Sequence, residues 1–219
     1  MTDDFTTDDF RAAPGVGDWK VQFTGPQTHY PVSDLSTALV LATAVVEAAE
    51  ATGVLPDIDL RPEGVTIVIR HDVEQQITAE SVDFAQRVSA AAHDMGLSVD
   101  VHRIQSMQIG IAQGAGVDVQ RFWVDALGYR VVNEEDAIDP IRRGPVLHFH
   151  ALDSGATGRG RTHIDVSLPA GLAESRVNAA LAAGGRLAPS SNAPAWWSLA
   201  SSDNHGLDIA AWPDTDGYT

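Results

Sequence analysis

The chain has 219 residues, of which 44% are hydrophobic, so it can bury one large core or two of ordinary size. Thirty acidic against 14 basic residues give a formal charge of −16, which disfavours nucleic acid and anionic membranes as partners. The absence of cysteine excludes disulfides, thiolate catalysis and cysteine-bound metal. The sequence has no apolar run of the ~20 residues that span a bilayer and no secretion signal, so we expect a cytoplasmic protein.

The first half of the chain carries the patterns of a small α+β domain. An acidic segment, residues 1–17, comes first, and we assign it no chemistry. The clearest patterns after it are two helices and two strands: helices from Ser33 or Asp34 to Thr52 and from Thr78 to Met95, and strands at 19–24 and 65–70. The apolar stripe of the first helix is expected at Leu35, Leu39, Ala42, Val46 and Ala49. These elements define a domain over residues 18–98.

Several short motifs lie between the two helices and in the second one: Pro56–Arg61, Val65–Ile69, His71-Asp72, Ile77-Thr78, Asp83 and Ala85. With them this region resembles pterin-4a-carbinolamine dehydratase, in which three histidines surround the pterin and supply acid–base groups. The resemblance makes His71 a catalytic residue; a surface histidine at a strand end is the alternative. Val54 and Leu55 stand where that family has two adjacent histidines. Neither transfers a proton, and one missing acid–base group costs ~10²–10⁴ in rate, so we expect little dehydratase activity.

The second half of the chain contains a strand that alternates in character. Ile164, Val166 and Leu168 face one way, while the polar residues between them face the other. A helix pattern at 172–183 and three short strands follow this strand. The same order of strand, helix and further strands precedes it, beginning with a strand at 107–112. Two βαβββ units in tandem are therefore predicted.

The tandem units carry a consistent set of motifs: Phe122-Trp123, Leu127-Gly128-Tyr129, the strand opened by His163, and Asp203–Asp208. In this order they resemble the vicinal oxygen chelate superfamily, which includes glyoxalase I, over residues 105–213. The resemblance implies one divalent metal, Zn, Fe, Mn, Ni or Mg, in the cleft between the units. The ligands that it implies are Gln108, His163 and Asp208. As alternatives, Gln108 is a polar strand residue, His163 has no function in a site, and Asp208 is a surface or turn residue. Asp165 is a hydrogen-bond partner for His163 in either case.

Other residues complete the predicted site. His148 and His150 stand two apart on one strand and share a face, so His150 is a candidate fourth ligand or catalytic base. Arg159 and Arg161 flank the histidine-bearing strands and suit a carboxylate or phosphate on the substrate, although they also serve to balance surface acids. Trp196 and Trp197 are adjacent in a strand and face opposite ways, so one of them can line the pocket, and we assign Trp197 to substrate binding; a place in the core is the alternative.

We therefore predict an α+β protein with a small dehydratase-like domain followed by a paired βαβββ domain. The first hypothesis is a small-molecule enzyme or binding protein that uses the C-terminal cleft with a divalent metal, such as a glyoxalase-like lyase, and its ligand is expected to be anionic. The alternatives are a 4a-hydroxytetrahydropterin dehydratase and a non-catalytic ligand-binding or regulatory protein. The sequence leaves open whether the chain forms a homo-oligomer.

Overall fold

The structure is a computed structural model, and it describes residues 5–71, 76–114, 116, 118–152, 162–188, 192–202 and 205–213. The chain divides into two compact units, Met1–Gln105 with Trp212–Thr219, and Ser106–Ala211. We refer to them as the first and the second unit. Each combines a β-sheet with helices, so the predicted α+β class is confirmed.

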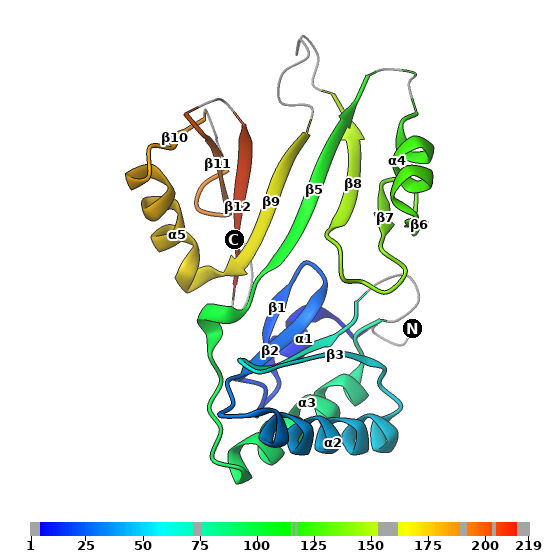
Figure 1. Ribbon diagram of the computed structural model, residues 1–219, viewed down its shortest axis with the longest axis vertical. Helices are drawn as coiled ribbons and strands as arrows, with labels where there is room; N and C mark the ends of the chain where they lie inside the picture. The colour runs from blue at the N-terminus through cyan, green and yellow to red at the C-terminus, as the bar shows by residue number, and fades with distance from the viewer. Residues whose placement is uncertain are drawn as a thin grey trace. The chain divides into compact units, whose positions relative to one another are not determined.

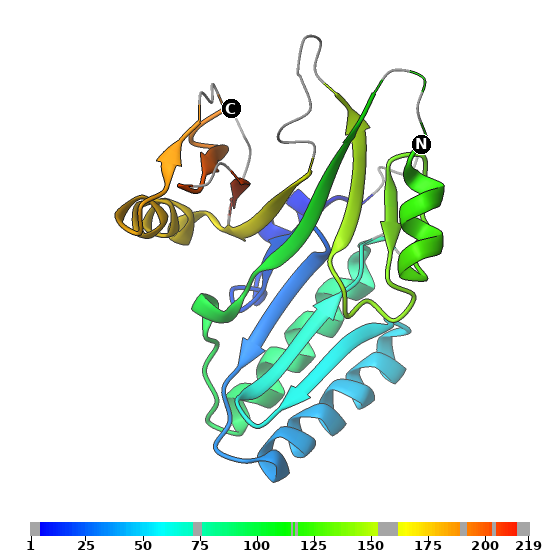
Figure 2. The same ribbon diagram turned by 45° about the horizontal axis from the view of Figure 1, so that its top comes forward.

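The first unit is a four-stranded antiparallel sheet with strand order β1-β2-β4-β3. Figures 1 and 2 show α2 and α3 on one face of this sheet. The two predicted helices and the two predicted strands are present, and β2 and β3 are strands outside that prediction. The elements are α1 (Thr7–Ala12), β1 (Lys20–Gln22), β2 (Gly25–Tyr30), α2 (Leu35–Thr52), β3 (Pro56–Arg61), β4 (Gly64–Ile69), α3 (Ala79–Asp94) and the 3-10 helix η1 (Val101–Arg103).

The ends of the long helices follow the predicted capping residues. The side chain of Asp34 accepts a hydrogen bond of 2.8 Å from the backbone N–H of Thr37, and Asp34 thereby caps α2. Gly53 ends α2 with φ = 75°, a left-handed conformation that glycine adopts without steric cost. At α3 the cap is Thr78, whose backbone N–H donates to the hydroxyl of Ser81.

The buried face of α2 differs from the predicted stripe. The residues that reach the core are Ala38, Leu41, Val45 and Ala48, whereas Leu35, Leu39 and Val46 are exposed. The prediction was wrong for these three residues, because α2 is apolar on nearly every side up to Val46 and periodicity does not select a face. Ala49 of the predicted stripe does pack against the core. Among the described residues, α2 is also the one helix long and apolar enough, by length and composition alone, to cross a membrane.

The core of the first unit takes in residues from the acidic N-terminal segment. Phe10 on α1 is fully buried, and Val16 is nearly so. They pack with Trp19, Tyr30 and the inner faces of α2, α3 and β4. Trp19 also meets Phe84 of α3 edge to face, with ring centroids 5.9 Å apart. The described residues of this segment therefore contribute to the fold of the first unit.

The second unit is an eight-stranded mixed sheet with strand order β10-β11-β12-β9-β5-β8-β7-β6 (Figure 1). The order strand, helix, three strands occurs twice, so the predicted pair of βαβββ motifs is confirmed. The two first strands, β5 and β9, pair antiparallel in the middle of the sheet. The elements are β5 (Ser106–Gln113), α4 (Gln120–Leu127), β6 (Arg130–Val131), β7 (Asp136–Ile138), β8 (Val146–Ala151), β9 (Thr162–Pro169), α5 (Ala170–Ala182), β10 (Arg186–Leu187), β11 (Trp196–Ala200) and β12 (Gly206–Trp212).

Both helices of the second unit cover the same face of the sheet. Ile109 on β5 lies directly opposite Ile164 on β9, and residues opposite each other share a face. On this face α4 packs over the β5–β8 half and α5 over the β9–β12 half, each through its own apolar cluster. The alternating residues, which include Gln108 opposite Asp165, lie on the other face, called the polar face below.

Candidate metal centre

Alternation on two strands places three polar side chains on the polar face. On β9, Val166 and Leu168 pack into the apolar cluster beneath α5, which turns His163 and Asp165 to the opposite side. On β12, Asp208 stands between Leu207 and Ile209, which belong to the same cluster. The local apolar pattern therefore fixes the direction of all three polar residues.

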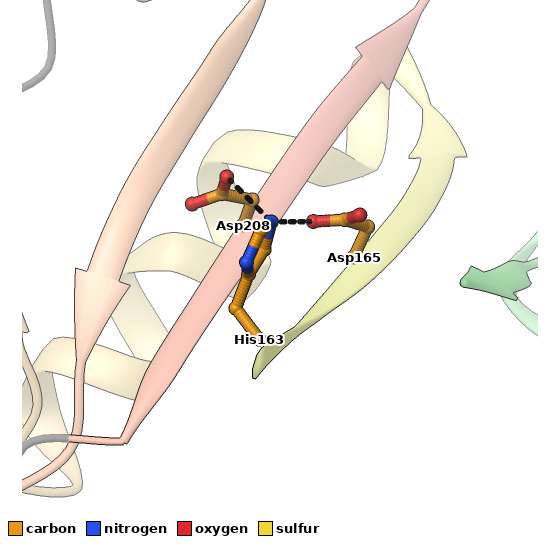
Figure 3. A group of neighbouring side chains, drawn as sticks. All are labelled: His163, Asp165 and Asp208. Carbon is orange, nitrogen blue, oxygen red and sulfur yellow. Dashed lines mark ion pairs between the residues drawn. The ribbon is translucent and has the colours of Figure 1, made fainter. Parts of the chain in front are cut away.

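The three side chains converge on one point. The Nε2 atom of His163 lies 3.3 Å from Oδ1 of Asp165 and 3.9 Å from Oδ2 of Asp208. One ligand atom from each residue lies within 4.8 Å of the other two, and Figure 3 shows the carboxylates approaching the imidazole from two sides. Two donors bound at about 2.1 Å to a tetrahedral zinc are about 3.4 Å apart, so the observed spacing approaches that of a coordination shell.

The chemistry of this group fits a divalent metal. One imidazole and two carboxylates suit zinc and the harder first-row cations, and they do not require a thiolate. All three side chains are partly buried. Within the described ranges, this is the only group of three or more histidines, cysteines or acids with such a spacing. His163, Asp165 and Asp208 are therefore the residues that could hold a metal.

The electrostatics of the group are those of a site with excess negative charge. The hydrogen bond with Asp165 raises the pKa of His163 above its ordinary value, although burial acts in the opposite direction. Burial raises the pKa of Asp208, and the hydrogen bond from Ser198 and the nearby histidines only partly offset this effect. A divalent cation would relieve both effects, because it stabilises the carboxylates and takes the place of the imidazole proton.

His150 on β8 borders the group. Its ring centroid lies 5.5 Å from that of His163, with the two planes at 66°. The Nδ1 atom is 3.1 Å from the carbonyl oxygen of Ala151, which can only accept, so Nδ1 carries the proton in this hydrogen bond. With the proton on Nδ1, the Nε2 atom is the one that can present a lone pair. This Nε2 is buried and has no hydrogen-bond partner among the described residues.

His148 continues the row of histidines away from the three-residue group. Its ring stacks on that of His150 with centroids 5.9 Å apart, and its Nδ1 lies 2.9 Å from Oδ1 of Asp136 on β7. This hydrogen bond raises the pKa of His148 above its ordinary value. Burial alone would raise the pKa of Asp136, but hydrogen bonds from His148 and Asn133 outweigh it and leave the pKa lowered.

Comparison with protein-family models matches residues 111–210 to the glyoxalase-like domain. This agrees with the predicted resemblance of the C-terminal half and with the tandem βαβββ order of the second unit. The match does not reach residues 18–98, and the resemblance of that region to pterin-4a-carbinolamine dehydratase stays a prediction. No curated protein matches the chain.

The other residues predicted to bind metal or substrate are Gln108, Trp197 and two arginines. Gln108, predicted as a metal ligand, lies on the polar face directly opposite Asp165, and its role as a ligand stays a prediction. Trp197 packs against the apolar cluster beneath α5, whereas its neighbour Trp196 is 40% exposed. Arg159 and Arg161 lie outside the described residues.

The histidine predicted as catalytic in the first unit lies apart from any such group. His71 is exposed directly after β4, and its backbone N–H donates to the carbonyl of Thr24. Val54 is buried in the core, and Leu55 is 64% exposed. Neither Val54 nor Leu55 therefore supplies an acid–base group to act together with His71.

Sequence reasoning missed two acids of the polar face. Asp165 was predicted only as the hydrogen-bond partner of His163, but its carboxylate also belongs to the group of donors. The spacing His-x-Asp on an alternating strand puts both side chains on one face, and that signal could have identified it. Asp136 carried no such signal, because its pairing with His148 depends on the register of β7 against β8.

Proposed function

We propose that the second unit is a metal-dependent enzyme that acts on small organic molecules at its polar face. His163, Asp165 and Asp208 would hold the metal, and their convergence is the observation that carries the proposal. When bound, a divalent cation would polarise an oxygen of the ligand as a Lewis acid. The match of residues 111–210 to the glyoxalase-like domain supports a small-molecule ligand.

His150 supplies the acid–base group of this proposal. A neutral imidazole with its Nε2 lone pair unpartnered, next to the three-residue group, can accept a proton from a bound ligand. The hydrogen bond from Nδ1 to the carbonyl of Ala151 holds the ring in that tautomer. Proton abstraction by His150 next to a polarised oxygen is the reaction step that the geometry supports best.

We assign the function to the second unit because the described part of the first shows no comparable group of side chains. Val54 and Leu55 cannot transfer protons, and His71 stands without a partner group of this kind among the described residues. The charge of −16 supports a small molecule over nucleic acid as the partner. Arg159 and Arg161 are the residues that we propose for binding an anionic substrate, and the proposed enzyme does not depend on them.

Titration calorimetry with Zn²⁺ or Co²⁺ on the metal-free full-length protein tests the metal centre. The wild type is expected to bind one ion, and His163→Ala or Asp208→Asn should weaken binding by at least ~100-fold, since loss of a ligand exceeds the effect of losing an outer contact. Glu174→Gln, which removes an exposed acid from α5, is the charge-matched control and should bind as the wild type does. A wild type that binds no metal would refute the centre.

Turnover is tested separately. The wild type, His150→Ala and Asp208→Asn are each supplied with the same concentration of metal. All three are then assayed for turnover of small carbonyl and hydroxy compounds. Turnover that both substitutions reduce supports the enzyme, and a fall of ~10²–10⁴-fold is expected for His150→Ala. Ligand binding without turnover in the wild type would favour the non-catalytic alternative.

A further inference from the structure

Gly110 on β5 lies directly across the central strand pair from His163. A Cβ atom at Gly110 would come within 2.5 Å of Cε1 and 2.6 Å of Nε2 of that imidazole. Contacts this short essentially never occur for a real Cβ, so the ring occupies the space that any other residue would need. On the other neighbouring strand, a Cβ at Gly206 would lie 3.1 Å from Cβ of His163. His163 is therefore flanked by a glycine on each side.

The backbone of Gly110 gives no reason of its own for a glycine. Its φ is not among the positive values that favour this residue, and it lies inside a strand of the central pair. Glycine in a strand interior weakens the strand, because it loses more conformational entropy than other residues and packs no side chain. The close approach of the imidazole is what this position accommodates.

The open space at Gly110 also allows side chains from two strands that are not neighbours to meet. β5 lies between β8 and β9, so side chains on β8 and β9 must lean over it to meet. The rings of His150 and His163 do meet, at 5.5 Å between centroids. The β5 residues beneath this meeting point are Gly110, opposite His163, and Ala112, opposite His150 in the β5–β8 pair. Neither carries a side chain longer than a methyl group.

We propose that Gly110 is a positioning residue that seats the imidazole of His163 over β5. The seat directs Nε2 of His163 toward Asp165 and Asp208 and holds the ring against His150. Its effect on metal affinity rests on the proposed function, whereas the position of the ring does not. Any side chain at Gly110 forces His163 into another rotamer, because the clash involves the ring atoms themselves.

The test is the substitution Gly110→Ala in the full-length protein, with Gly171→Ala on α5 as the matched control. A Cβ at Gly171 meets nothing within 4 Å. Two readouts are taken: the nuclear Overhauser effect between the rings of His150 and His163 in the metal-free protein, and the affinity for Co²⁺. Gly110→Ala should abolish the ring–ring signal and weaken Co²⁺ binding by ~10–100-fold, the range of a lost supporting contact. Gly171→Ala should change neither.

Two further variants keep the test decisive. Gly206→Ala makes a milder contact with His163, and it should reduce the ring–ring signal and the affinity less than Gly110→Ala does. If Gly110→Ala does not fold, the double variant Gly110→Ala/His163→Ala should, because the three nearest atoms to the new Cβ all belong to His163. Failure of the double variant to fold would refute the seat.

The two proposals fail in different ways. A wild type that binds no Co²⁺ but shows a ring–ring signal sensitive to Gly110→Ala would refute the metal centre and leave the seat intact. A Gly110→Ala protein that keeps both the ring–ring signal and wild-type affinity would overturn the positioning role while the metal centre stands.

Discussion

The Nδ1 atom of His148 lies 2.9 Å from Oδ1 of Asp136, its direct partner across the β7–β8 pair. The hydrogen bond raises the pKa of His148 above its ordinary 6.5, and the pKa of Asp136 lies below its ordinary 3.8. The His148 contribution to stability is complete below pH 6.5 and is lost as the pH rises through the raised pKa. The Asp136 contribution is complete above pH 3.8 and is lost as the pH falls through the lowered pKa.

The pair should therefore stabilise the second unit most between these two ordinary pKa values. We expect Asp136→Asn to lower the melting temperature more at about pH 5.5 than at about pH 9, where His148 is neutral with or without its partner. Thermal unfolding of wild type and variant at the two pH values measures the difference. Glu174→Gln corrects for the change in net charge, and a loss from Asp136→Asn that is equal at both pH values would contradict the prediction.

Asp165 should control the protonation of His163 as well as metal binding. Its hydrogen bond is the main cause of the raised pKa of His163, so Asp165→Asn should lower that pKa. NMR titration of the imidazole in the metal-free protein measures the shift. The same variant should bind Co²⁺ more weakly than the wild type, because an amide oxygen is a poorer donor than a carboxylate. An unchanged pKa would show that the contact of 3.3 Å is not formed in solution.

The acidic N-terminal segment should be necessary for the stability of the first unit. Phe10 is fully buried in its core, so Phe10→Ala should destabilise this unit by about 3–5 kcal/mol. Urea unfolding followed by the NMR signal of the indole N–H of Trp19, whose ring lies in the same core, reports on this unit. Phe5→Ala, at a partly buried position, should cost less. A loss for Phe10→Ala no larger than that for Phe5→Ala would mean that α1 is detached in solution.

Dehydratase turnover on a 4a-hydroxypterin should be near background. Restoring the two histidines meets an obstacle, because Val54 is buried and Leu55 is exposed. Leu55→His should fold as the wild type does, whereas Val54→His buries an imidazole and should cost about 1–3 kcal/mol if its nitrogens stay unpaired. Unfolding curves and a turnover assay on both single variants and on the double variant measure these effects. Robust turnover by the wild type would overturn the prediction.

Much of the fold of the second unit follows from local sequence. The alternation of Ile164, Val166 and Leu168 predicts both β9 and the direction of His163, because one face must be buried. Gly128 ends α4 with φ = 67°, as its position after the apolar helix pattern indicates. Such features depend on a few neighbouring residues, so the sequence carries them directly.

The candidate site depends on contacts that no local pattern encodes. Gly110 reads in the sequence as a small residue inside a strand, and its position against His163 becomes evident only with the register of β5 and β9. The buried face of α2 was predicted wrongly for a related reason. Leu39 and Leu41 have equal apolar character, and only packing decides that Leu41 is buried and Leu39 exposed.

The alignment of β9 with its neighbours β5 and β12 has a consequence for how the protein folds correctly. Slippage by one residue would turn His163 and Asp165 toward α5 and bring Val166 into the water, because successive strand residues point to opposite faces. The donors come from β9 and β12, which are neighbours in the sheet but are separated in the chain by α5, β10 and β11, so only the correct alignment of β9 with β12 brings them together. A metal ion that binds this arrangement would stabilise the correctly aligned sheet over its misaligned competitors. The ion would then act as a selector of strand alignment before it takes part in any reaction.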